Sequence, residues 1–155
     1  MFEGEVLSIY IARNEGEPTV AVDEIRAVAG QGLEGDRYYN HSGKFSHQEN
    51  PGREVTLIES EAIDALADEY GIQLDLGDSR RNIVTRGVPL NHLVGREFRV
   101  GGAVLEGVRL CEPCGYLEHL TVKGVRRGLA HRGGLNARIV AEGVIRRGDQ
   151  VTPAG

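Results

Sequence analysis

The chain of 155 residues has little material for cross-linking, since it contains only two cysteines, one methionine and no tryptophan. The two cysteines, Cys111 and Cys114, are three positions apart, and a disulfide between them would close too short a loop to stabilise a fold. A chain of this length buries roughly two-thirds of its unfolded surface and needs neither disulfides nor a structural metal to fold. We therefore expect a reducing compartment rather than secretion.

Long apolar runs are also absent. No segment approaches the roughly 18 apolar residues of a membrane-spanning helix, and the first residues, MFEGEV, lack the basic region of a secretory signal. Repeats, low-complexity tracts and linkers are absent too. These absences predict a cytoplasmic protein that has no membrane partner and forms a single domain over residues 1–155.

The net charge of −5 hides a strong asymmetry between the two halves of the chain. Residues 1–78 carry 5 Lys and Arg against 17 Asp and Glu, whereas residues 79–155 carry 13 against 6. Either the halves pair through ordinary surface contacts, or the basic half forms an anion pocket, since guanidinium groups suit phosphate and carboxylate. Nucleic acid is not an expected partner, because Phe98 and Tyr116 are the only aromatic residues of the basic half available for stacking.

Short apolar segments separated by glycine predict many short strands, and the chain contains 22 glycines. The expected strands cover residues 7–11, 20–25, 55–57, 80–87, 98–100, 104–110, 137–140 and 144–151, with a hairpin turn at 101–102 and a bend at 148–149. The clearest helix runs from Glu59 to Tyr70, where apolar residues recur at helical spacing and Gly71 supplies the C-cap. A single helical turn is expected at 90–94. The polar segment 29–52 is either a functional loop or disordered. This pattern predicts a mainly β, barrel-like fold with a few short helices.

The segment LCEPCGYLEHL (110–120) carries the most chemistry. Pro113 suits the first position of a helix, which would make Cys114 the second helical residue, among free backbone N–H groups. A thiol there is expected to ionise more easily than the reference pKa of about 8.5 implies. Four interpretations remain open: a zinc site with His119 and His131, a dithiol redox centre, a buried inert pair, and a thiolate ligand for a soft metal carried by an anionic cofactor. The neighbouring arginines favour the last.

Two further polar segments are candidate anion sites. Arg80, Arg81 and Asn82 begin an expected strand, where at most one of the two arginines faces a given pocket because adjacent strand residues point to opposite faces. The segment 131–134 (HRGG) combines a titratable ring, a guanidinium and flexible backbone. Solvated surface charge is an equally good interpretation of the arginines. His41 and His47 are more readily exposed loop histidines than metal ligands.

The order of GLEGDRY, VTLIESEAI, RRNIVTRGVPLNHLVGREFRVG, LCEPCGYLEHL, LAHRGGLNARIV and GVIRRGDQV resembles a small stand-alone MOSC domain. That family is named for the C-terminal domain of molybdenum cofactor sulfurases. The resemblance runs from about Gly32 to Val151. It implies a β-rich, barrel-like fold and either binding of a molybdenum–pterin cofactor or handling of its sulfur.

The resemblance also assigns candidate residues. Cys114 matches the family's signature cysteine, which implies a catalytic role and ligation of molybdenum, with Cys111 behind it. Arg81, Asn82 and Arg132 are the implied contacts of the pterin phosphate. Arg37, next to Asp36, is counted with the cofactor-binding residues because it matches a family motif, although chemistry alone assigns it no role.

Three functions follow from this resemblance. The first is a molybdenum-dependent enzyme that reduces N-hydroxylated substrates, with electrons from a separate donor protein because the sequence contains no flavin or haem motif. The second is a sulfur carrier or cofactor-delivery module that holds a persulfide on Cys114 without redox turnover. The third is an anion-binding domain with an inert cysteine. An enzyme is the preferred expectation.

Overall fold

The computed structural model describes residues 1–14, 16–37, 39 and 53–154. The strands are β1 (Gly4–Ile11), β2 (Val20–Val22), β3 (Glu24–Val28), β4 (Gly32–Leu33), β5 (Val55–Glu59), β6 (Ile83–Arg86), β7 (Glu97–Val100), β8 (Ala103–Leu110), β9 (Leu135–Ala141), β10 (Gly143–Arg146) and β11 (Gln150–Pro153). The α-helices are α1 (Ser60–Tyr70), α2 (Gly115–Leu120) and α3 (Val125–Gly128), and the 3-10 helices are η2 (Leu76–Ser79) and η3 (Leu90–Leu93). His41 and His47 lie outside the described residues.

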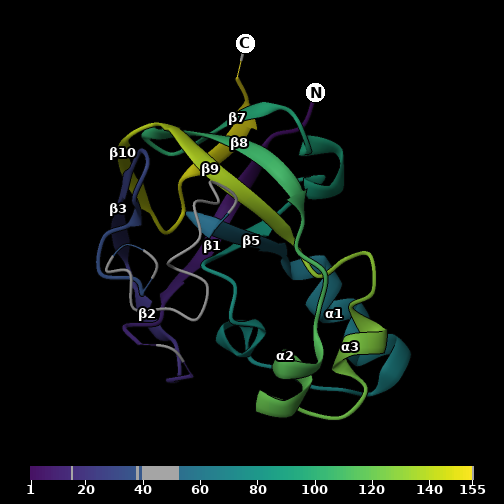
Figure 1. Cartoon of the computed structure of the whole chain (residues 1–155). Coiled ribbons are helices and arrows are strands. Elements are labelled where there is room, and N and C mark those ends of the chain that lie inside the picture. The colour runs from purple at the N-terminus through teal and green to yellow at the C-terminus, as the bar shows by residue number, and fades with distance from the viewer. Residues whose placement is uncertain (15, 38, 40–52, 155) are drawn as a thin grey trace.

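Within this described part of the chain, seven strands close into a barrel in the order β11-β7-β8-β9-β5-β6-β1, with β1 pairing back onto β11. The strands β5 and β6 run parallel, and the other neighbours in the barrel are antiparallel. The helices α1, α2 and α3 gather below one end of this barrel (Figure 1). The mainly β, barrel-like fold with short helices is therefore confirmed.

A second, three-stranded sheet has the order β10-β3-β4 and stands beside the barrel. Two segments that the sequence analysis predicted as continuous strands are each divided between the barrel and this second sheet. Residues 20–25 break at Asp23 into β2, which pairs with β1 of the barrel, and β3, which pairs with β10. Residues 144–151 likewise become β10 and β11, separated by the expected bend. A hydrogen bond from the Arg147 N–H to the Asp23 carbonyl, 2.9 Å long, joins the two break points.

The parallel strands β5 and β6 are buried on both faces. Leu57 and Ile83 are paired and contribute to the core inside the barrel, whereas their neighbours Ile58 and Val84 belong to a second core formed with the helices. All four side chains are fully buried. Since burying one such side chain stabilises a fold by about 1.5–3 kcal/mol, these two strands tie both cores together.

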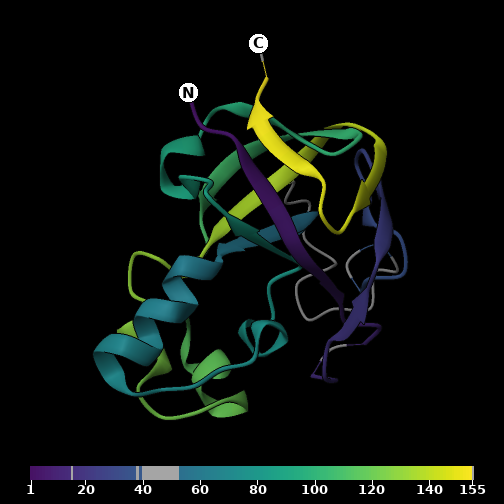
Figure 2. The same ribbon diagram turned by 180° about the vertical axis from the view of Figure 1, so that it is seen from behind.

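The helix α1 connects β5 to β6 and closely matches the expected helix. It begins one residue later than predicted, with Glu59 as its N-cap, and it ends at Gly71, whose φ of 68° is left-handed. The Gly71 N–H donates to the Ala67 carbonyl at 3.0 Å. Figure 2 shows α1 lying below the barrel, where its apolar stripe packs on the outer face of β5 and β6.

The expected strand over residues 80–87 begins three residues later, at Ile83. Residues 80–82 connect the 3-10 helix η2 to β6. Arg80 is the C-cap of η2 and has a left-handed φ of 62°. A capping box between Asp75 and Asp78 starts η2. A four-residue helix has no apolar periodicity, so the sequence offered no pattern by which to recognise it.

No helix of the described chain is long and apolar enough to span a membrane.

The carboxyl group of Glu59 predicts a pH dependence of stability. Burial and the nearby charge of Glu61 raise the pKa of Glu59 above its ordinary value of 4.5, although the Leu90 N–H and His92 act against this. The folded state therefore holds this proton at pH values where the unfolded chain has released it, and Glu59 lowers stability as pH rises through that window. We expect Glu59→Gln to gain stability relative to the wild type as the pH rises above 4.5.

Urea unfolding at several pH values measures this difference. Parallel stability curves for the two proteins would contradict the prediction.

Candidate functional site

The cysteine loop, residues 111–114, continues directly from β8. The Cys111 N–H donates to the Gly134 carbonyl at 2.8 Å, which extends the pairing of β8 with β9 by one step. The chain is neither helical nor turned between Cys111 and Cys114. The cysteine loop is therefore an irregular segment that continues from the barrel.

Cys114 is the N-cap of α2, with φ −120° and ψ 170°, and not the second helical residue. The predicted helix start is wrong by two positions, because Pro113 packs against another loop and does not begin the helix. Pro113 is buried against the 131–134 loop, where a Cβ on Gly133 would come within 2.7 Å of its Cδ. Glycine at position 133 therefore lets the two loops pack closely against each other.

The two thiols differ in exposure and do not form a disulfide: Cys114 is exposed and Cys111 is half-buried. The exposure of Cys114 argues against the interpretation as a buried pair. Within the described part of the chain, no three His, Cys, Asp or Glu residues group as a metal site, and His131 pairs instead with Glu112.

Arg81 fixes the cysteine loop to the 131–134 loop. Its Nε donates to the Gly133 carbonyl at 2.7 Å and its Nη2 to the Cys111 carbonyl at 3.1 Å. These contacts use Nε and Nη2, and Nη1 forms no hydrogen bond with any residue that the structure describes. Arg80 turns the other way and donates to the Glu17 carbonyl, which agrees with the expectation that only one of the two faces a given pocket.

Arg126 is a second guanidinium beside the cysteine loop. A Cβ placed on Gly115, the residue after Cys114, would lie 3.8 Å from Nη1 of Arg126. Glu118 on α2 accepts hydrogen bonds from the backbone N–H groups of Gly124 and Arg126, which sets the position of α3 against α2. The sequence analysis counted Arg126 only as part of the basic half, because nothing in the spacing shows that α3 folds back toward Cys114.

Asn82 is only 7 % exposed, and its amide is occupied by other parts of the fold. Its Oδ1 accepts from the backbone N–H and the hydroxyl of Thr56 at 3.0 and 3.1 Å, and its Nδ2 donates to the Tyr10 carbonyl at 3.0 Å. Asp36, also buried, lies 3.5 Å from Nδ2 and accepts the Ala12 N–H at 2.9 Å. The side chain of Asn82 thus ties β5 to β1.

The other two candidate arginines lie in different surroundings. Arg132 is directed toward the helices, where Nε donates to the Gly128 carbonyl at 2.9 Å and Nη1 forms an ion pair with Glu69 at 2.8 Å. Arg37 follows β4, and its backbone N–H donates to the Ala12 carbonyl at 2.7 Å. Of the arginines predicted as cofactor contacts, Arg81 is the one that the structure brings onto the cysteine loop.

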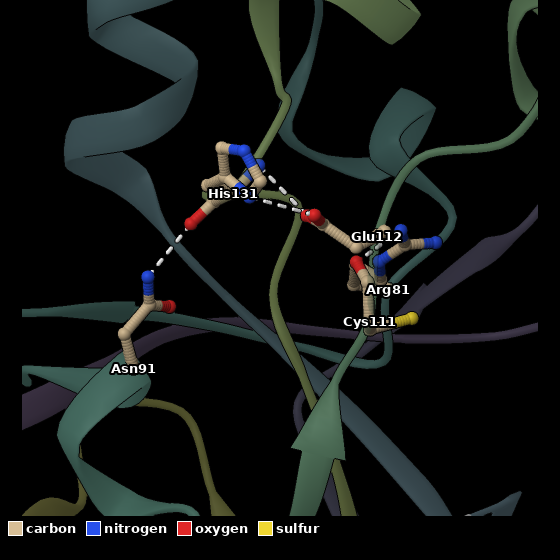
Figure 3. A network of polar contacts seen from close by, with 5 residues as sticks. All are labelled: Arg81, Asn91, Cys111, Glu112 and His131. Atoms are coloured by element: carbon tan, nitrogen blue, oxygen red, sulfur yellow. Dashed lines mark hydrogen bonds and ion pairs between the residues drawn. The ribbon is translucent and has the colours of Figure 1, made fainter.

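His131 and Glu112 form a polar network with Asn91, shown in Figure 3. The Glu112 carboxylate accepts the His131 backbone N–H at 2.7 Å and lies 3.0 Å from Nδ1 of the ring. The carbonyl of His131 accepts from Asn91 Nδ2 at 2.7 Å. His131 has a left-handed φ of 64°, which costs a non-glycine residue about 1–2 kcal/mol. The sequence analysis considered His131 only as a weak candidate and did not consider Glu112.

A cleft of about 440 Å³ opens beside the C-terminal end of α2. It is lined by Tyr10, Gly16, Pro18, Thr19, Ala21, Asp75, Gly77, Asp78, Arg80, Leu120 and Thr121. Gly77 is required there, because a Cβ would come within 2.9 Å of the Tyr10 ring. The cleft and the cysteine loop therefore lie at opposite ends of one short helix.

The family profile of the MOSC domain matches residues 44–152, which include the barrel from β5 onward, the cysteine loop and all three helices. The chain belongs to the MOSC domain family. MOSC domains can bind the molybdenum cofactor.

Solved structures show the same fold at low sequence identity. YuaD from Bacillus subtilis has a TM-score of 0.81 at 17% identity, and the match covers 97% of each chain. YiiM from Geobacillus stearothermophilus has a TM-score of 0.75 at 15% identity, covering 98% of this chain and 75% of that one. YiiM from Escherichia coli has a TM-score of 0.68 at 19% identity, covering 100% and 70%. A search of the curated proteins finds no match.

The structural role of Asn82 predicts a large effect of its removal. Asn82→Ala leaves partly buried groups of Thr56 and Tyr10 without their partner, so we expect the free energy of unfolding to fall by about 1–3 kcal/mol. Asn14→Ala, which removes an exposed amide bonded to Glu17, is the matched control and should change stability by less than about 0.5 kcal/mol. Equal stabilities of the two variants in urea unfolding would show that Asn82 does not hold the strands.

The exposure of the two thiols predicts selective modification. Iodoacetamide should alkylate Cys114 at least about tenfold faster than Cys111 in the folded protein, because reaction requires access to the sulfur. Peptide mass mapping over a time course measures both rates. Equal rates, or faster labelling of Cys111, would contradict the described loop.

Proposed function

We propose that this MOSC domain binds a molybdenum–pterin cofactor and that Cys114 is its thiolate ligand to the metal. The observation that carries the proposal is the position of an exposed thiol at the end of a loop held by hydrogen bonds, with guanidinium groups of Arg81 and Arg126 beside that loop. A soft thiolate suits molybdenum, and guanidinium groups suit the anionic part of the cofactor.

The residues present fit such a group. Cys114 offers its sulfur to solvent, and Arg81 keeps Nη1 for a phosphate oxygen while its other nitrogens hold the loop. Arg126 is exposed on α3 and is able to turn toward the same anion. Asn82, Arg132 and Arg37 are not proposed as direct contacts of the cofactor in this conformation. Asn82 supports the segment before β6, which also contains Arg81. Arg132 and Arg37 would need to exchange their present contacts to reach a ligand.

The proposed activity is reduction of an N-hydroxylated substrate. The chemistry that the bound cofactor supplies is a two-electron reduction at the metal, and removal of the hydroxyl oxygen as water also consumes two protons. Cys114 holds the metal at the protein surface, where substrate and an electron-donating protein both have access. Arg81 and Arg126 bind and orient the anion, which fixes the metal relative to Cys114.

A sulfur-carrier function is the alternative, and the exposure of Cys114 favours it equally, since a persulfide also needs an accessible sulfur. The composition of the purified protein distinguishes the two. One extra sulfur atom on the Cys114 peptide, without molybdenum, supports the carrier. Molybdenum with a bound pterin supports the enzyme.

Replacement of the proposed ligand tests the proposal directly. Cys114→Ser should reduce the molybdenum content of protein purified from a cofactor-producing host by at least about tenfold, because a neutral hydroxyl is a poor ligand for a soft metal. Cys111→Ser is the matched control and should keep most of the metal. Full molybdenum content in Cys114→Ser, measured by elemental analysis, would refute ligation by Cys114.

A further inference from the structure

We infer that Glu112 is a positioning residue for Cys114: it clamps the cysteine loop to the backbone and ring of His131 and so holds Cys114 at the start of α2. We call the contacts between Glu112 and His131 the latch. The inference concerns a residue that the proposed function does not use, and only its effect on metal content depends on that function.

The latch consists of one hydrogen bond from the His131 backbone and one contact of the His131 ring. The Glu112 carboxylate accepts the His131 backbone N–H at 2.7 Å on Oε1, and Oε2 lies 3.0 Å from Nδ1 of the ring. Figure 3 shows Glu112 turned toward His131, whereas the sulfur of Cys111 points away from both. Both carboxylate oxygens are therefore engaged by His131.

The backbone of His131 adopts an unusual conformation where it contacts Glu112. Its φ of 64° lies in the region that favours glycine, and glycine occupies positions 133 and 134 of the same loop. The imidazole at position 131 is 87 % exposed and lies against the Glu112 carboxylate.

The latch is anchored in the barrel. Asn91 of η3 donates to the His131 carbonyl at 2.7 Å, and η3 is held by Leu90 and Leu93, which are buried in the barrel core. A continuous path of contacts thus runs from the core through Asn91 and His131 to Glu112, two residues before Cys114. Arg81 and the Gly134 carbonyl hold the other end of the cysteine loop, at Cys111.

The expected effect is modest, because exposed ion pairs contribute little to stability. Glu112 is 45 % exposed, so the hydrogen bond to the backbone N–H is the stronger part of the latch. A hydrogen bond of typical net strength corresponds to roughly a tenfold change in the population of a locally opened loop. Loss of the latch should therefore loosen Cys114 without unfolding the domain.

Hydrogen exchange of two backbone amides distinguishes the ends of the loop. The Glu118 N–H donates to the Cys114 carbonyl at 3.2 Å and reports on Cys114, whereas the Cys111 N–H reports on the end held by Arg81. In metal-free protein, Glu112→Ala should speed exchange of the Glu118 amide about tenfold and that of the Cys111 amide by less than about threefold.

Two further variants control this experiment. Glu112→Gln keeps an oxygen for the His131 N–H and should restore most of the protection of the Glu118 amide. Glu142→Ala removes an equally exposed ion pair, formed with Arg26 at 3.0 Å away from the loop, and should leave both amides unchanged. Exchange of the Glu118 amide in Glu112→Ala within about twofold of wild type, or no rescue by Gln, would overturn the inference.

The molybdenum content of the same variants, purified from a cofactor-producing host, links the latch to the proposed function. We expect Glu112→Ala to retain several-fold less metal than wild type and Glu142→Ala to match it. Faster exchange with undiminished metal would overturn the positioning role toward the cofactor. A wild-type protein that carries no molybdenum would count against the proposed function, whereas the exchange data from metal-free protein would still decide the role of Glu112.

Discussion

The pairing of β8 with β9 is the constraint on which the site depends. The register places Leu110 opposite Leu135, and the next hydrogen bond, from Cys111 to Gly134, carries this pairing beyond the barrel. The cysteine loop and the 131–134 loop thus leave the same pair of strands side by side. Arg81 then reaches both loops from the segment before β6. The place of Cys114 follows from strand register and not from the preferences of a short helix.

This arrangement gives Arg81 two functions at once. Its contacts with two carbonyl oxygens use the fixed fork of the guanidinium group, which a lysine would not reproduce because its ammonium is a single point charge. Among the described residues, Nη1 of the same group has no hydrogen-bond partner. An arginine that looks from the sequence like an anion ligand is therefore first a structural residue, and any anion bound there meets a side chain that is already fixed.

Much of the barrel follows from local patterns in the sequence. The stripe of α1, its glycine cap and the β7–β8 hairpin depend on residues close together in the chain, so periodicity and turn chemistry are enough to find them. The division of two apolar runs between the barrel and the small sheet depends on contacts between distant residues, such as Asp23 and Arg147, which no local pattern records. The arrangement of the site likewise depends on contacts between residues that are far apart in the sequence.

Within the site, the sequence identified Cys114 and Arg81 through their motifs, but it placed Cys114 in a helix because Pro113 is a common first helical residue. Burial of Pro113 against Gly133 decides otherwise, and that contact joins segments twenty residues apart. The sequence analysis assigned no role to Arg126 or to Glu112 of the cysteine loop. The approach of Arg126 to Gly115 and the contact of Glu112 with His131 arise only when α3 folds back on α2 and the two loops meet.

The strands β8 and β9 are antiparallel neighbours, which a two-residue turn is sufficient to join. The chain instead makes a long excursion through residues 111–134, which contains both cysteines, α2 and α3. Barrel topology does not require this excursion. Its apolar side chains Leu117, Val125 and Leu129 pack, together with α1, on the outward faces of Ile58 and Val84, so a shortened connection would leave those faces more open to water.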